Sequence, residues 1–188
     1  MNDSSVNRKK IKLTDGKLIL RPYCSRDIPA LHEAIRESIA EISPWLTFAH
    51  KDYSIKETRE WIKRGPKEWK KGKSYEFGIF DTEDGKLLGG CGINAVDKIH
   101  RYANLGYWVR TSRLGQGIAT TATRLLAKWG FDTLKLKRIE IVVDTRNQGS
   151  LRVAEKSGAK KEGVLRNRLI LYDKFYDAVM HSLIPGDL

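Results

Sequence analysis

The sequence predicts an α/β fold, in which a mixed, mostly antiparallel central sheet of about seven strands is flanked by about four helices. One supporting observation is strand-type alternation, since the apolar Leu105, Tyr107 and Val109 are separated by single residues. Another is helix-type spacing, since apolar residues recur about every 3.6 positions after Ile118. The third is the order of segments: strand, two helices, three strands, helix, strand, helix and two strands.

Cap and turn signals set the boundaries of the N-terminal elements. We expect Ser25 to cap the first helix, and Ser54 with Glu57 fits a capping box for the second. Gly65-Pro66 should break or kink that second helix, and Asp84-Gly85 is typical of a tight hairpin turn. The elements expected here are a strand at 17–22, a helix at 27–42, a helix after 54, and hairpin strands at 75–80 and 86–96.

The C-terminal half begins with a third antiparallel strand that leads into a glycine-rich loop and the long helix. A further strand and a short helix follow, and Gly158 is expected to end that helix. The elements expected here are a strand at 101–109, a helix from 118, a strand at 138–143, a helix at 150–156, and strands at 159–164 and 175–183.

Length and composition favour a single domain at residues 13–188, preceded by a flexible basic tail at 1–12. The chain has 188 residues, of which 40% are hydrophobic, and this is enough for a packed core. Because no apolar run approaches 18 residues and the N-terminus is polar, we expect no membrane span and no secretory signal, and therefore a cytoplasmic location. Cys24 and Cys91 lack metal-ligand spacing and the 4 histidines are scattered, so no metal is expected.

The formal net charge of +12 favours acidic partners, which include nucleic acid, a phosphorylated cofactor and an acidic protein. The basic residues are spread along the chain, as on an ordinary solvated surface. Because no recognition helix and no aromatic RNA-binding pattern is found, nucleic acid is not the expected partner.

The most informative segment is the glycine-rich loop Arg113-Leu-Gly-Gln-Gly-Ile-Ala-Thr120. A glycine loop at a helix start directs several free backbone N–H groups at one point, and the helix dipole adds positive charge there. Such a site binds phosphate. The loop lacks the Lys-Ser/Thr of the nucleotide P-loop and the third glycine of the dinucleotide fingerprint. The pattern also fits a plain strand-to-helix turn, so its meaning depends on other segments.

Together with two further segments, the loop resembles that of the GNAT superfamily of acetyl-CoA-dependent N-acetyltransferases, over roughly residues 15–183. The family signature R/Q-x-x-G-x-G/A opens the third helix, and 114–119 matches its two small positions, with Leu114 where Arg or Gln is usual. Gly106-Tyr-Trp-Val109 and the motif from Asn147 through Ser150 to Gly158 are similar to the RimJ/RimL branch. Named members of that branch acetylate the N-termini of ribosomal proteins. The resemblance implies the GNAT fold.

The resemblance also implies that acetyl-CoA is the co-substrate. Backbone N–H groups of 115–120 would bind its pyrophosphate, because glycine allows a close backbone approach. The strand that ends at Val109 would diverge from the next, and the pantetheine arm would add there as an extra strand. A backbone N–H on that strand would polarise the thioester carbonyl, and Asn147 would hydrogen-bond the arm. The implied cofactor-binding residues are Trp108, Val109, Leu114, Gly115, Gln116, Gly117, Ile118, Ala119, Thr120 and Asn147.

The resemblance implies direct attack by an amine, without an acyl-enzyme. Many family members protonate the leaving thiolate with a tyrosine, but Ala154 stands at that position. Ser150 is the hypothesised replacement, as proposed for the RimJ/RimL branch. Relatives commonly carry a glutamate where this chain has Asn104, so the general base is open; Glu76, on a central strand, is the best candidate, ahead of His100, Asp144 and Tyr172. We assign Ser150, Glu76 and Asn104 to the catalytic set.

The acceptor is expected to be a primary amine, most simply a protein N-terminus. An α-amine has a pKa near 8, so its neutral form costs only about 1 kcal/mol at pH 7, against roughly 4–5 kcal/mol for a lysine amine. Trp45 matches a Pro-Trp segment that lines the acceptor cleft in relatives, and Tyr75 and Tyr172 are further candidates. An acidic ribosomal protein is a possible acceptor, and a homodimer is a possible assembly.

Two alternatives remain open. One is acetylation of a small amine such as a polyamine or an aminoglycoside, which would require an acidic cleft. The other is a catalytically weak GNAT module that binds nucleic acid, favoured by Asn104 and the missing tyrosine. Acetyl transfer would reject the second, and steeply salt-dependent RNA affinity without turnover would favour it.

Overall fold

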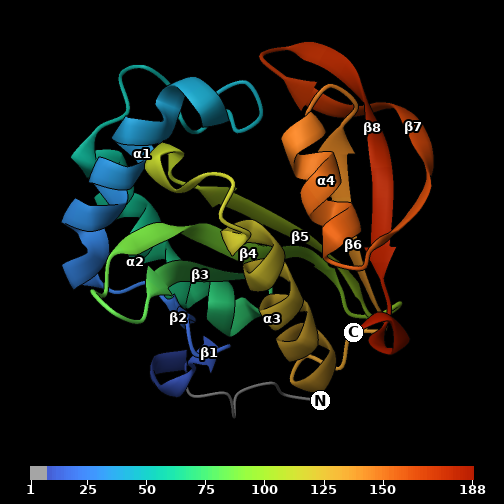
Figure 1. Cartoon of the computed structure of the whole chain (residues 1–188), viewed down its shortest axis with the longest axis horizontal. Helices are drawn as coiled ribbons and strands as arrows, with labels where there is room; N and C mark the ends of the chain where they lie inside the picture. The colour runs from blue at the N-terminus through green and yellow to red at the C-terminus, as the bar shows by residue number, and fades with distance from the viewer. Residues whose placement is uncertain (1–7) are drawn as a thin grey trace.

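The computed structural model describes residues 8–188 and contains an eight-stranded sheet in the order β1-β2-β3-β4-β5-β6-β8-β7 (Figure 1). Among the described strands, only β5 and β6 are parallel neighbours. The predicted α/β class is confirmed, and the eighth strand is the two-residue β1, which is too short to show an alternation. The strands are β1 Leu13–Thr14, β2 Leu18–Pro22, β3 Ser74–Asp81, β4 Leu87–Asp97, β5 Tyr102–Val109, β6 Arg138–Asp144, β7 Lys160–Leu171 and β8 Lys174–Leu183.

The α-helices are α1 Ile28–Ile42, α2 Ile55–Lys71, α3 Ile118–Asp132 and α4 Gln148–Lys156. The predicted tail lies mostly at residues 1–7, outside the described residues. Within its described part, Arg8 donates a 2.6 Å hydrogen bond to the Tyr23 carbonyl, and Ile11 packs against the core. No helix in the described part of the chain is long and apolar enough to cross a bilayer.

The predicted range of the first helix agrees with α1, but its predicted cap is wrong. Ser25 lies inside a short 3-10 turn, and the residue that organises the start of α1 is Asp27. The Asp27 carboxylate accepts from the Cys24 backbone N–H at 2.8 Å and pairs with Arg21 at 2.7 Å. Of the break or kink predicted at Gly65-Pro66, the break is wrong, because α2 continues through Pro66 to Lys71. Buried Ile62 and Trp69 lie on either side of the proline and hold both halves of the helix against the protein.

The capping box of α2 is confirmed, because Ser54 and Glu57 exchange side-chain and backbone hydrogen bonds. The β3–β4 hairpin is confirmed as well, and Gly85 adopts φ 70° at its turn. β7 is longer than the strand predicted at 159–164, because most of its residues are exposed and show no apolar alternation that would have marked its end. It forms a hairpin with β8. Its turn consists of Tyr172 and Asp173, which both have positive φ.

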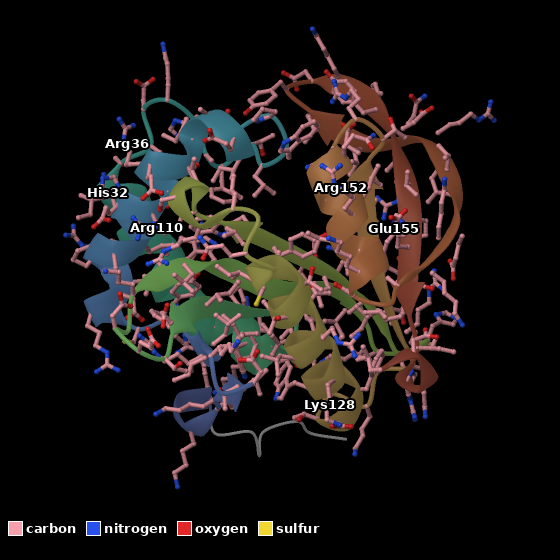
Figure 2. All side chains as sticks on the ribbon, in the orientation of Figure 1. His32, Arg36, Arg110, Lys128, Arg152 and Glu155 are labelled. Carbon is pink, nitrogen blue, oxygen red and sulfur yellow. The ribbon has the colours of Figure 1, made fainter. Side chains whose placement is uncertain are left out.

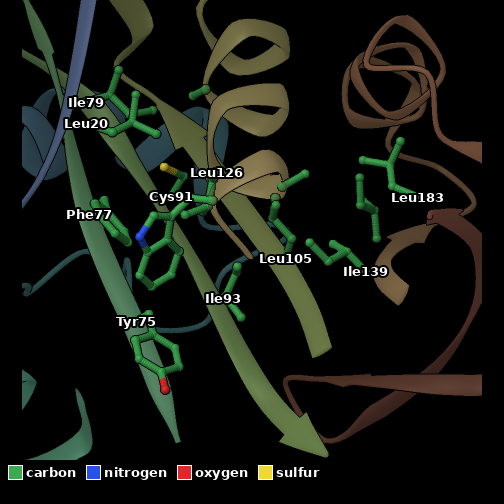
Figure 3. Close-up of a cluster of buried hydrophobic side chains, with 14 of the residues drawn as sticks. Leu20, Tyr75, Phe77, Ile79, Cys91, Ile93, Leu105, Leu126, Ile139 and Leu183 are labelled. Atoms are coloured by element: carbon green, nitrogen blue, oxygen red, sulfur yellow. The ribbon is translucent and has the colours of Figure 1, made fainter. Parts of the chain in front are cut away.

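The larger core cluster lies between α3 and one face of β3, β4 and β5 (Figure 3). Tyr75, Phe77, Ile93 and Leu105 contribute to it from the strands, and Leu126 contributes from α3. A second cluster joins α1 and the first half of α2 to Tyr23, Phe80 and Leu87. Because side chains alternate along a strand, the sheet face opposite α3 carries Glu76, Gly92 and Gly106, and this face lines the site.

Candidate active site

Two cavities meet on the central strands. The smaller has a volume of about 400 Å³ and lies between the sheet, α1, α2 and the loop that joins these helices. The larger has a volume of about 710 Å³ and runs along β5, the glycine loop, β6 and α4. The cavities share lining residues, so they form one continuous site. The shared residues are Leu46, Asn94, Gly106, Tyr107 and Trp108.

The glycine loop forms one wall of the larger cavity. Gly115 and Gly117 adopt φ 75° and 76°, a left-handed conformation that glycine adopts without strain. Gly117 is the N-cap of α3, and the N–H groups of the first turn of a helix have no partner within it. A Cβ atom at either glycine would meet nothing within 4 Å, so the backbone faces open space. This geometry suits a phosphate group.

The loop is held in place by α1. Arg110, which follows β5 and is labelled in Figure 2, donates to Glu33 at 2.7 Å and from Nε to Glu37 at 2.9 Å. Glu37 also accepts from the Ser112 backbone N–H at 2.9 Å. The hydrogen bonds from Arg110 and Ser112 lower the pKa of Glu37 to about 2. The residues that precede Gly115 therefore have a fixed connection to the first helix.

β5 and β6 diverge beside the loop. Their parallel pairing covers Tyr102 to Asn104 on β5 and stops there, and Figure 1 shows the strands separating beyond that point. From Leu105 to Val109, β5 remains paired with β4 only. Backbone groups of β5 that face the gap are therefore available to an added extended chain. The divergence that the family resemblance implied is confirmed.

Every residue predicted to bind the cofactor lines the larger cavity. Ile118 is buried in the core, so only its backbone can face a ligand. Sequence reasoning missed three cationic residues of this lining, Arg113, Arg152 and Lys156, which add positive charge near the glycine loop and α4. The loop, the cations and the gap beside β5 together fit acetyl-CoA, which carries phosphates and an extended arm.

Asn147, Ser150 and Tyr107 form a connected group beside the gap. Asn147 caps α4, and its Oδ1 accepts from the Ser150 backbone N–H at 3.0 Å, so its amide NH₂ is the donor left for a ligand. The Tyr107 hydroxyl lies 3.0 Å from both the Ser150 carbonyl oxygen and Ser150 Oγ. Burial raises the pKa of Tyr107 to about 12, so this phenol keeps its proton at neutral pH. Sequence reasoning recognised Tyr107 only as a motif residue and missed this contact.

Glu76 lies in the smaller cavity, in register with two glycines. Across β3, β4 and β5, Glu76 pairs with Gly92, which in turn pairs with Gly106. A Cβ on Gly92 would lie only 2.2 Å from Glu76 Oε2, so the carboxylate occupies the space above that glycine. Ser74 donates to Glu76 Oε1 at 2.6 Å. Burial raises the pKa of Glu76 against the opposing effect of this bond, which makes the carboxylate a better proton acceptor.

Asn104 and Trp45 line the larger cavity. Asn104 Nδ2 donates to Asn94 Oδ1 at 3.1 Å, and Asn94 lines both cavities. The Arg146 guanidinium lies 5.7 Å from the centre of the Trp45 ring. The structure therefore brings Asn104 and Trp45 to the site, together with Asn94, which sequence reasoning missed because an isolated strand asparagine carries no motif.

Tyr75 and Tyr172 line neither cavity. Tyr75 is in the core and packs against Trp69 and Trp129, on the sheet face opposite Glu76. Tyr172 lies at the tip of the β7–β8 hairpin, where its hydroxyl donates to the Ser43 carbonyl at 2.6 Å. Tyr172 thus links the hairpin to the end of α1 instead of lining the predicted substrate site.

Comparison with known proteins identifies relatives across most of the chain. The model of the acetyltransferase (GNAT) domain matches residues 17–160. The Bacillus subtilis protein named "Probable N-acetyltransferase YjcK" is 35% identical over 137 residues, which cover 72% of this chain and 76% of that protein. The Escherichia coli protein named "Ribosomal-protein-serine acetyltransferase" is 25% identical over 174 residues, which cover 93% of this chain and 96% of that protein.

A solved structure described as Mycobacterium smegmatis RimJ in complex with CoA-disulfide has the same fold. It superposes with a TM-score of 0.83 at 27% identity, and the match covers 91% of this chain and 83% of that one. The bound group named for that structure is a form of coenzyme A, the kind of ligand that the larger cavity of this chain fits.

Proposed function

The chain belongs to the GNAT family of N-acetyltransferases, and we propose that it transfers the acetyl group of acetyl-CoA to the α-amine at the N-terminus of a peptide or protein. The observation that carries this proposal is the half-buried Glu76 carboxylate, which lines the smaller cavity in register with Gly92 and, through it, with Gly106, a residue of both cavities. A proton acceptor on the sheet face that leads to the cofactor cavity suits an incoming ammonium group.

The larger cavity holds acetyl-CoA, which supplies a thioester that an amine can attack directly. The backbone of Gly115 to Thr120 binds the pyrophosphate, and the amide NH₂ of Asn147 hydrogen-bonds the pantetheine arm. The unpaired side of β5 pairs with that arm and offers an N–H to the thioester oxygen. These contacts hold the reacting carbonyl close to Gly106 and Tyr107.

The amine approaches from the smaller cavity. Glu76 first takes one proton from the ammonium group. The neutral nitrogen then forms a bond to the acetyl carbon, the carbon–sulfur bond breaks, and the second proton of the nitrogen leaves to solvent. The departing sulfur takes the proton of the Ser150 hydroxyl, and Ser150 Oγ takes the proton of the Tyr107 phenol, which lies 3.0 Å away. Exchange with solvent restores Tyr107 and Glu76 after the transfer. Tyr107 thereby takes the role of the general acid, for which many family members use a tyrosine at the position of Ala154.

Titration of the acceptor favours an α-amine over a lysine side chain. With a pKa near 8, an α-amine is roughly one-tenth neutral at pH 7, whereas a lysine amine at about 10.4 needs roughly 4–5 kcal/mol to lose its proton. A single carboxylate, even one with a raised pKa, is a weak base for the second task.

A small cationic amine is the second candidate, because the smaller cavity is lined by three carboxylates. Glu57, Glu60 and Glu76 outnumber Arg64, and His50 pairs with Glu57 at 2.7 Å. The same charges disfavour an acceptor whose first residues are acidic.

An acceptor screen tests the proposal. Purified protein is incubated with acetyl-CoA and with N-terminal peptides, the same peptides blocked by Nα-acetylation, polyamines or aminoglycosides, and thiol release is followed. We expect release with free N-termini and little with blocked peptides that retain a lysine. Release with polyamines alone would overturn the α-amine proposal, and the absence of heat on titration with coenzyme A would overturn the cofactor assignment.

A further inference from the structure

We infer that the acceptor carries a bulky apolar group next to its amine, as in a peptide that begins with Phe, Leu or Met; this rests on the proposed function and names its substrate class. The smaller cavity has a volume of about 400 Å³, within the range that encloses a small ligand group. Its junction with the larger cavity fixes where the amine must lie.

The wall that α1 and the α1–α2 loop form beyond the junction is mostly apolar, whereas α2 also contributes the charged Glu57, Glu60 and Arg64. α1 contributes Leu31 and Ile35, which are 2% and 3% exposed, so the inner end is removed from bulk water. The loop that joins α1 to α2 contributes Phe48 and Tyr53, whose ring centres lie 6.4 Å apart. Trp61 of α2 completes the wall and packs edge-on against Tyr23 at 5.2 Å.

Three glycines of β4 and β5 line the sheet side of the cavity, and one of them, Gly106, has open space above it. A Cβ at Gly106 would meet nothing within 4 Å, and this residue lines both cavities. The Glu76 carboxylate occupies the space above Gly92, and the Tyr23 hydroxyl and the Trp108 ring lie next to Gly90. A substrate therefore meets a negative charge at Glu76 and apolar surface on the side of α1 and α2.

The charged residues of the α2 lining lie away from the apolar wall formed by α1 and the α1–α2 loop. Glu57 is engaged by Ser54 and His50 in the cap of α2. Glu60 and Arg64 are exposed, which places them at the solvent side of the lining. An ammonium group thus pairs with Glu76, and the group on the neighbouring carbon packs under α1 and α2.

Apolar burial determines the preference. A leucine or phenylalanine side chain that packs against this wall removes apolar surface from water, which stabilises the complex by about 25 cal/mol per Å² buried. A serine side chain leaves the wall unfilled and loses hydrogen bonds to water. Hydrophobic pockets discriminate by about 10-fold or more for even small differences in side-chain size.

Two sources share this chemistry, namely an N-terminal residue and a free arylalkylamine. The experiment compares peptides identical except for the first residue, which is Phe, Leu, Met, Ala, Ser or Asp, and adds phenethylamine as a separate arm. We expect kcat/KM to be at least about tenfold higher for Phe, Leu and Met than for Ala and Ser, and lowest for Asp. Turnover of phenethylamine at the level of the Phe peptide would identify the free amine as the source of the same chemistry.

A wall variant tests whether the smaller cavity causes the preference. Phe48 is 44% exposed, so Phe48→Ala should leave folding intact. It should lower the ratio of kcat/KM for the Phe peptide to kcat/KM for the Ala peptide severalfold. The matched control is Ile99→Ala, which removes an apolar side chain that is 86% exposed and lies outside both cavities.

The outcomes separate the two proposals. Equal kcat/KM across all first residues, or an unchanged Phe-to-Ala ratio in Phe48→Ala, would overturn the apolar preference while acetylation of free N-termini stands. Transfer to polyamines but to no peptide would overturn the proposed function itself.

Discussion

Replacing Gly92 with alanine should displace the Glu76 carboxylate from its position in the site while the residue remains a glutamate. The added Cβ would lie 2.2 Å from Oε2, 2.6 Å from Cδ and 2.8 Å from Oε1 of Glu76. These separations are far inside van der Waals contact, so one group must move. The mobile group is the carboxylate at the end of a flexible side chain, whereas Gly92 is held by strand pairing on both sides. The variant should therefore fold and carry a displaced Glu76.

The expected loss follows from the work that the base performs. A positioned general base contributes roughly 10²–10⁴-fold to rate. An α-amine with a pKa near 8 is already about one-tenth neutral at pH 7, so the contribution here lies at the lower end. We expect kcat to fall roughly 100-fold at pH 7 in Gly92→Ala and in Glu76→Gln. The deficit should shrink above pH 8, where solvent delivers the neutral amine.

Stability provides an independent check on Glu76. Because burial raises its folded-state pKa above the unfolded value, the folded state binds more protons, and this contribution to stability is lost as pH rises through the folded pKa. Above the folded-state pKa, the ionised carboxylate therefore opposes folding. Glu76→Gln should unfold at a higher temperature than the wild type while losing turnover, a combination typical of a functional buried charge.

The assay follows thiol release with a peptide acceptor at pH 7 and pH 9, together with calorimetric titration of coenzyme A. The Kd for coenzyme A should stay within about twofold, because the larger cavity is untouched. Gly163→Ala is the matched control, since its added Cβ would meet nothing within 4 Å on the exposed strand β7. Turnover within threefold of the wild type in both Gly92→Ala and Glu76→Gln would refute the assignment of Glu76 as base.

Four further predictions concern the rest of the molecule. Ser150→Ala should lower kcat roughly tenfold and raise the KM for acetyl-CoA less, whereas an unchanged kcat would leave Ser150 as a residue of the helix start. Tyr107→Phe should also lower kcat, and the double variant should lose less than the product of the single losses, since the hydroxyls are in contact. In Gly117→Ala, φ 76° costs about 1–2 kcal/mol, so the free loop should relax to another conformation. Coenzyme A must then restore the loop, and calorimetry should find its Kd raised roughly 5–30-fold. Burial of His181 lowers its pKa. The free energy of unfolding should therefore fall as the pH drops through the unfolded-state pKa near 6.5. Scanning calorimetry at pH 7 and pH 5 should find a smaller decrease in unfolding temperature for His181→Leu than for the wild type.

Local signals in the sequence were sufficient for most of the fold. The Ser54–Glu57 box and the Asp84-Gly85 turn are complete within a few residues, and the structure has both. The range of α1 was predicted to within one residue, but its cap was mispredicted because the turn before the helix depends on an ion pair between Arg21 and Asp27, which no cap rule contains. The helix through Pro66 depends on burial at Ile62 and Trp69, and this appears only when the tertiary packing is known.

The candidate site divides in the same way. Residues that act through the backbone, such as Gly115 and Gly117, follow from a motif. The Tyr107–Ser150 contact joins β5 to α4 across 43 residues of sequence, so no local pattern reveals it. Tyr75 shows a further limit: with Glu76 it was predicted to reach the site, but neighbouring strand residues point to opposite faces.

That alternation explains how three strands serve a core and a reaction at once. On the α3 face, large side chains such as Phe77, Ile93 and Leu105 fill the interior. On the other face, Gly92 and Gly106 stand in register with Glu76, so the sheet leaves room there for a substrate and a carboxylate. β5 then separates from β6 beyond Asn104, and its freed side faces the larger cavity. One strand therefore borders both cavities, which places an amine above Gly106 within reach of a thioester held along the free side of β5, as direct transfer requires.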